Sequence, residues 1–100
     1  MTPTRYNVRV SEELRHLVPR FLANRRLDLE QFHAAAARSD FEAARHIGHN
    51  MKGAGGGYGF DEITRLGDEI ERRAKAADPG LWALGDALAD YLGNLDVTFE

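Results

Sequence analysis

The 100-residue sequence contains no cysteine. This absence excludes disulfide bonds, thiolate metal ligands and cysteine nucleophiles together. The sequence also lacks an apolar run near the roughly 20 residues that a membrane span requires, and we expect no signal peptide at its start. We therefore expect a soluble protein with no membrane partner, located by default in the cytoplasm.

A surplus of positive charge is missing as well. The chain has 13 basic and 16 acidic residues, which gives a formal net charge of −3. Proteins that bind the phosphate backbone of nucleic acids favour a basic surplus. We therefore do not expect nucleic acid as a partner.

Helices, in contrast, are strongly indicated. Hydrophobic residues make up 43% of the chain and charged residues 29%, as in ordinary globular domains. Apolar residues recur at helical spacing in four segments, and we find no convincing strand. We predict an all-α fold, an antiparallel up-and-down four-helix bundle with a short extra N-terminal helix from Ser11, its N-cap, to Leu17. Residues 1–10 are expected to form an extended N-terminal arm and residues 11–100 the bundle domain.

The boundaries of the four helices follow from residues that favour a first turn. The second helix is expected to end near Gly55, and the apolar stripe of the fourth to run from Leu81 to Leu95. The residues expected at the helix starts are Pro19, Ser39 or Asp40, Phe60 or Asp61, and Asp78 with Pro79.

The stretch from Arg45 to Phe60 contains six of the ten glycines of the chain. On a helix with about 100° per residue, its apolar and small residues gather on one side, and His49 lies about 150° from their centre. The neighbours of His49 on its own face are the cations Arg45 and Lys52 and two glycines, Gly53 and Gly56. We therefore predict that the imidazole projects into solvent on a positively charged surface that suits an anion.

Nucleotide-binding motifs do not explain this glycine-rich stretch. A P-loop requires G-x-x-x-x-G-K-[ST], whereas Lys52 precedes most of the glycines and no Ser or Thr follows it. The dinucleotide fingerprint G-x-G-x-x-G also fails, because Tyr58 and Phe60 stand where its last glycine is required.

A metal site is an alternative that the spacing allows but does not favour. His46 and His49 lie about 60° apart on the helix, so that both could bind one ion. Neither histidine has a glutamate three residues before it, as bundle metal sites require, and the H-E-x-x-H motif is absent.

The string from His49 to Phe60, HNMKGAGGGYGF, resembles the histidine-containing phosphotransfer (HPt) domain of bacterial phosphorelays. The family pattern is His, any residue, Leu or Met, Lys-Gly, two or three small residues, and a hydrophobic residue with Gly. Segments 17–26 and 39–42 resemble the first long helix of that family and its turn into the histidine helix. The resemblance covers about Val8 to Asp78, and more loosely the last helix.

The resemblance implies a phosphocarrier without kinase activity of its own. His49 would accept a phosphoryl group from a receiver-domain aspartyl phosphate and pass it to another receiver. Expected partners are response-regulator receiver domains and, as a further candidate, a hybrid sensor kinase. We expect a monomer with no cofactor on this chain, because the Mg²⁺ would belong to the receiver.

The site residues suit this chemistry. Histidine offers a neutral nitrogen nucleophile near pH 7, and Lys52 could neutralise the phosphoryl oxygens. Gly53 and Gly56 would leave room for the phosphoryl group and the partner. The family's acceptor for the second ring nitrogen matches Glu71.

Three questions stay open at this point. Arg45 could contact phosphate or pair with Glu42. The chain could also be a helical adaptor that binds a receiver without transferring anything, or a metal-binding bundle that uses His46 and His49.

Overall fold

The structure is a computed structural model in which residues 5–100 are described. Four α-helices dominate these described residues, so the predicted four-helix fold is confirmed. The part of the predicted N-terminal arm in residues 1–4 lies outside the described residues. In chain order the elements are β1 (Tyr6–Val10), η1 (Glu12–Leu17), α1 (Val18–Ala37), α2 (Phe41–Gly55), η2 (Gly56–Tyr58), α3 (Asp61–Lys75), η3 (Pro79–Ala83), α4 (Leu84–Gly93) and β2 (Leu95–Phe99).

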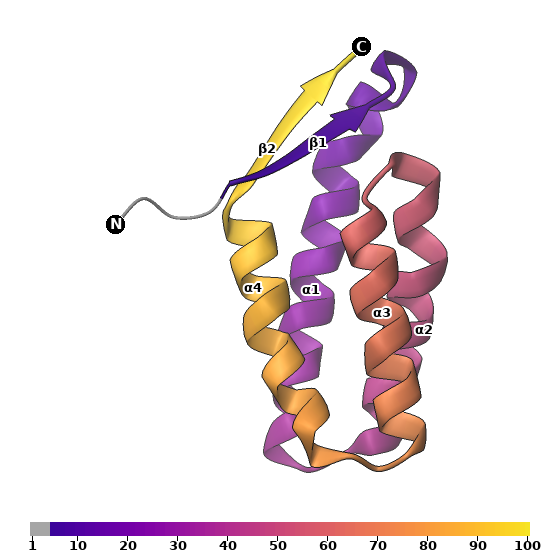
Figure 1. The fold of residues 1–100 in the computed structure, drawn as a ribbon, viewed down its shortest axis with the longest axis vertical. Helices are drawn as coiled ribbons and strands as arrows, with labels where there is room; N and C mark the ends of the chain where they lie inside the picture. Colours follow the sequence, from indigo (N-terminus) through magenta and orange to yellow (C-terminus); the bar gives the residue numbers. More distant parts are fainter. Residues whose placement is uncertain (1–4) are drawn as a thin grey trace.

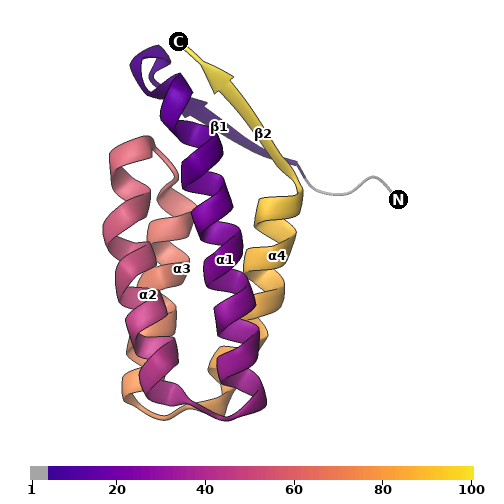
Figure 2. The same cartoon turned by 180° about the vertical axis from the view of Figure 1, so that it is seen from behind.

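Successive helices run in opposite directions along one long axis (Figure 1). The helices α2 and α3 lie side by side in both views, and α1 and α4 complete the bundle (Figure 2). Their apolar stripes meet in a common core. The largest fully buried side chains are Phe32, Phe60, Met51, Ile63, Leu66, Ile70, Leu81, Leu88 and Val10.

The helix starts follow the predicted capping chemistry at two of three positions. The Asp40 carboxylate accepts a hydrogen bond from the Ala43 amide at 3.0 Å. Asp78 caps the 3₁₀-helix η3 by accepting from the Gly80 amide at 2.9 Å. Ser11 is the N-cap residue of η1, as predicted, but its side chain makes no capping hydrogen bond. The segment after it is a 3₁₀-helix, and Pro19 lies in the first turn of α1.

Two short strands correct the prediction that the chain has none. β1 and β2 form a parallel pair in which Val8 lies opposite Val97. The helix α4 ends at Gly93, with Asn94 as its C-cap. Leu95, which was predicted in the last helical stripe, therefore begins β2 instead. The Asn94 amide group donates to the Asp90 carbonyl at 2.8 Å, and this bond closes the helix. The pairing joins the two ends of the described chain. Alternating side chains in a five-residue segment can indicate a strand, but they do not indicate which distant segment that strand pairs with.

The strand pair lies across one end of the bundle, where β1 leads into η1 and β2 follows α4 (Figure 1). Val8 and Val10 are buried there and join the core. Within residues 5–100, no helix combines the length and apolar character needed to cross a membrane.

Candidate functional site

His49 lies on the outer face of α2, where 68% of its side chain is exposed to solvent. Its Nδ1 atom lies 2.8 Å from Oε2 of Glu71 on α3. An ionised carboxylate only accepts hydrogen bonds, so Nδ1 must carry the proton of this bond. In the neutral ring, Nε2 therefore keeps a free lone pair on the solvent side.

Glu71 is a buried carboxylate, with 6% of the residue exposed. The hydrogen bond from His49 lowers the pKa of this carboxyl below its ordinary value, and the nearby charges of Lys75 and Lys52 act in the same direction. Glu71 is therefore ionised at neutral pH. The helical pattern places it at the edge of the α3 stripe, and the structure shows its carboxylate reaching across to α2.

Lys52 lies one turn after His49 and is held by α3. Its Nζ atom is 3.0 Å from Oδ1 of Asp68 and 3.6 Å from Oε1 of Glu71. The hydrogen bond to Asp68 is the main cause of a raised pKa of the Lys52 ammonium. The helical spacing predicted Lys52 beside His49, but Asp68 was not among the predicted site residues. The signal for Asp68 is its spacing, because a residue three positions before Glu71 shares its helix face.

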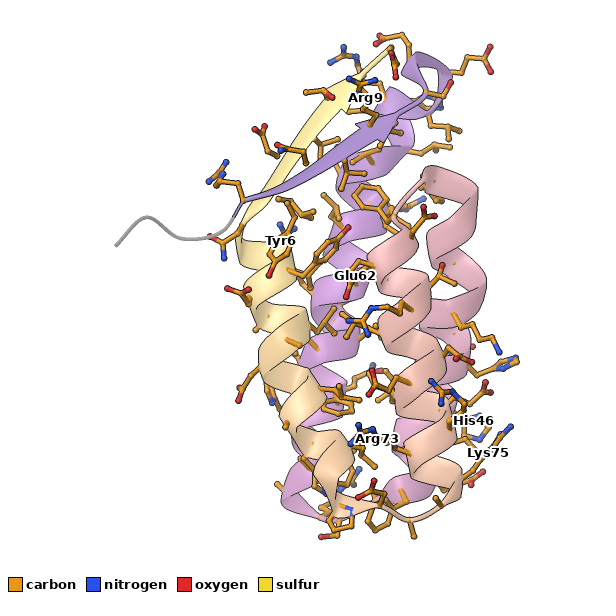
Figure 3. The ribbon with its side chains drawn as sticks, viewed as in Figure 1. Tyr6, Arg9, His46, Glu62, Arg73 and Lys75 are labelled. Carbon is orange, nitrogen blue, oxygen red and sulfur yellow. The ribbon has the colours of Figure 1, made fainter. Side chains whose placement is uncertain are left out.

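Arg45 lies one turn before His49 and forms an ion pair along its own helix. Its Nη2 atom is 2.6 Å from Oε1 of Glu42. The same carboxylate oxygen lies 3.2 Å from Nε2 of His46. Of the two alternatives that the sequence left open for Arg45, the structure shows the pair with Glu42. His46 points outward from α2, away from the bundle core (Figure 3).

The glycines of the site divide into two kinds. A β-carbon on Gly53 would meet no described atom within 4 Å, and one on Gly56 would meet only Thr64 Oγ1, at 3.9 Å. Gly48 and Gly67 instead lie where α2 and α3 come closest, with no room for a side chain. The first two leave open surface beside His49, and the second two bring the helices together.

The arrangement offers little to a metal ion. In the part of the chain that the structure describes, no group of three or more His, Cys, Asp or Glu side chains is placed to hold one. His49 is bonded through Nδ1 to Glu71, and His46 is turned toward Glu42. His49 therefore pairs with a carboxylate of α3, whereas His46 pairs with a carboxylate one turn away on its own helix.

Comparison with known proteins agrees with this geometry. The family model of the Hpt domain matches residues 16–98. Searches of curated proteins and of solved structures gave no significant match. Hpt domains are phosphocarrier modules, not kinases, that act in histidine phosphotransfer in two-component phosphorelays and interact with response-regulator receiver domains. With most of its length matched, the chain belongs to the Hpt domain family.

Proposed function

We propose that this protein is a phosphorelay intermediate in which His49 accepts a phosphoryl group from the aspartyl phosphate of one receiver domain. The group then passes to the aspartate of another receiver. The antiparallel up-and-down bundle, with its short helix before α1, is the scaffold that we propose for this exchange.

The observation that carries the proposal is the exposed His49 ring bonded through Nδ1 to a buried carboxylate. In the proposed step the Nε2 lone pair attacks phosphorus, and the bond from phosphorus to the aspartate oxygen breaks. The electron pair of that bond returns to the receiver carboxylate. The ring gains positive charge and keeps its Nδ1 proton, and the negative charge of Glu71 stabilises it. No proton has to move, so the reverse step is equally direct.

Other residues of the site would position the phosphoryl group. Phosphoryl transfer depends mainly on positioning and on neutralising charge, and Lys52 lies one turn from His49 to do so. Gly53 and Gly56 leave the surface open for the active-site loops of a receiver. Arg45 could exchange Glu42 for a phosphoryl oxygen. The Mg²⁺ that assists the aspartyl phosphate belongs, in this proposal, to the receiver.

A labelling experiment tests the proposal. The purified protein is mixed with a receiver domain that carries a radiolabelled aspartyl phosphate. We expect label that is lost in acid and retained in alkali, as for phosphohistidine. His49→Gln should abolish it, and His46→Gln, which removes an exposed histidine of the same helix, should keep it. Equal labelling of the His49→Gln variant would contradict the proposal. Receiver binding by His49→Ala without any transfer to the wild type would favour a non-transferring adaptor.

A further inference from the structure

Asp68 joins the His49 site to a second cation. Its Oδ1 atom is 3.0 Å from Nζ of Lys52, and its Oδ2 atom is 2.9 Å from Nε of Arg72. Charges of opposite sign therefore alternate from Arg72 through Asp68 and Lys52 to the Glu71 carboxylate that holds His49. The Lys52 ammonium is shared between two carboxylates before any phosphoryl group arrives.

We propose that Asp68 is a positioning residue for Lys52, which holds the ammonium group beside the His49–Glu71 pair and competes for it with a phosphoryl group on His49. The inference rests on the proposed function, because the competing anion is the phosphoryl group of phosphohistidine. Asp68 would thereby set how strongly the Lys52 ammonium binds the phosphoryl group and how easily that group is transferred onward.

The geometry allows Lys52 to change partners. Its side chain is 46% exposed, and that of Asp68 is 35% exposed, so neither is locked in the core. A phosphoryl group carries a charge of about −1.5 to −2 near pH 7 and is a stronger partner than one carboxylate. If Lys52 turns to it, Asp68 keeps Arg72 as a counter-ion. The exchange therefore leaves no charge of this cluster unpaired.

Glu69 provides a matched control for Asp68. It is the next residue of α3 and also pairs with two cations, Arg73 at 2.9 Å and Arg65 at 3.3 Å. Its partner Arg73 lies on the side of α3 toward α4, whereas His46 and Lys75 lie on the side of α3 away from α4 (Figure 3). Glu69→Gln therefore removes the same charge as Asp68→Asn without touching Lys52.

The test uses phosphoramidate as a small phosphodonor, so that receiver docking plays no part. Attack by His49 Nε2 breaks the P–N bond of phosphoramidate, and ammonia leaves. The pKa of the phosphoryl group on His49 is then measured by ³¹P NMR titration. A nearby cation favours the dianion, so a freed Lys52 lowers this pKa. We expect Asp68→Asn to raise the acid dissociation constant of the phosphoryl group about threefold, the size of a partly exposed ion pair.

Two comparisons decide whether Asp68 acts through Lys52. Glu69→Gln should leave the dissociation constant unchanged, and Asp68→Asn should have no further effect in a Lys52→Gln background. The same threefold change in either case would overturn the inference, because a general charge effect would then explain it.

Failure of the proposed function gives a different result. Absence of phosphohistidine in the loaded wild type would contradict the function itself. A separate readout needs no phosphorylation: the Lys52 ammonium is titrated by NMR in the free protein, and Asp68→Asn should lower its pKa. An unchanged Lys52 pKa would overturn the inference whether or not His49 is phosphorylated.

Discussion

Gly48 of α2 and Gly67 of α3 face each other so closely that a β-carbon on either would lie 2.7 Å from the carbonyl oxygen of the other. A β-carbon on Gly67 would also lie 2.5 Å from the Lys52 amide nitrogen. These contacts are with backbone atoms, which cannot move aside as a flexible side chain can. The two glycines therefore fix the approach of α2 and α3 that brings Glu71 to His49.

Replacing Gly67 with alanine should destabilise the protein and disturb the site. The added methyl group must push the helices apart, and overpacking of this kind costs about 1–3 kcal/mol of unfolding free energy. Chemical denaturation measures this loss. The same variant should label less well at His49, because the Glu71 carboxylate moves away from Nδ1.

Gly53→Ala is the control for that experiment. Gly53 is also helical, but a β-carbon there meets no described atom within 4 Å. Alanine is favoured over glycine inside a helix, so stability should be unchanged or higher by up to about 1 kcal/mol. A Gly67→Ala variant as stable as Gly53→Ala would contradict the close-packing account.

A larger side chain at Gly53 should separate docking from chemistry. Gly53→Leu should fold, because the position is open, but the side chain would stand where a receiver approaches His49. We expect transfer from a phosphorylated receiver to slow at least tenfold, whereas labelling by phosphoramidate stays near the wild-type rate. Gly93→Leu, equally open but at the far end of α4, should change neither rate. Equal slowing with both donors would show that Gly53 serves the chemistry and not access.

Acid should destabilise the wild type more steeply than a variant without the Glu71 carboxyl group. The hydrogen bond from His49 holds the pKa of Glu71 below 4.5 in the folded protein. A carboxyl group with a lowered folded pKa stabilises the protein above its unfolded pKa, and this contribution is lost as the pH falls through the folded value.

The unfolding free energy of the wild type should therefore fall as the pH drops from the ordinary carboxyl range through the lowered pKa of Glu71, and the slope should be smaller in Glu71→Gln. Denaturation at several pH values measures both slopes. Asp68, whose pKa is lowered mainly by Lys52, titrates in both proteins and does not affect the comparison. Identical slopes would contradict the role assigned to Glu71.

The sequence predicted the parts of the site that depend on one helix. The period of α2 is enough to place His49 on the outer face, with Lys52 one turn away and Met51 in the core. Asp40, which caps α2, was likewise one of the two predicted candidates, because capping depends on residues within one turn.

What the sequence did not predict depends on pairs of elements. The ion pair of Lys52 with Asp68 and the contact between Gly48 and Gly67 arise from the packing of two helices, which no single helical pattern contains. The pairing of β1 with β2 joins opposite ends of the chain. The partner of Arg45 was also undecided, because phosphate and Glu42 suit a guanidinium group equally well.

The nitrogen of His49 that carries the phosphoryl group tests the central claim most directly. Glu71 occupies Nδ1, so only Nε2 is free to attack phosphorus. The phosphorylated protein can be examined by ³¹P NMR together with ¹⁵N NMR of labelled histidine. The account predicts a phosphoryl group on Nε2 of His49, and a group on Nδ1 or on any other residue would contradict it.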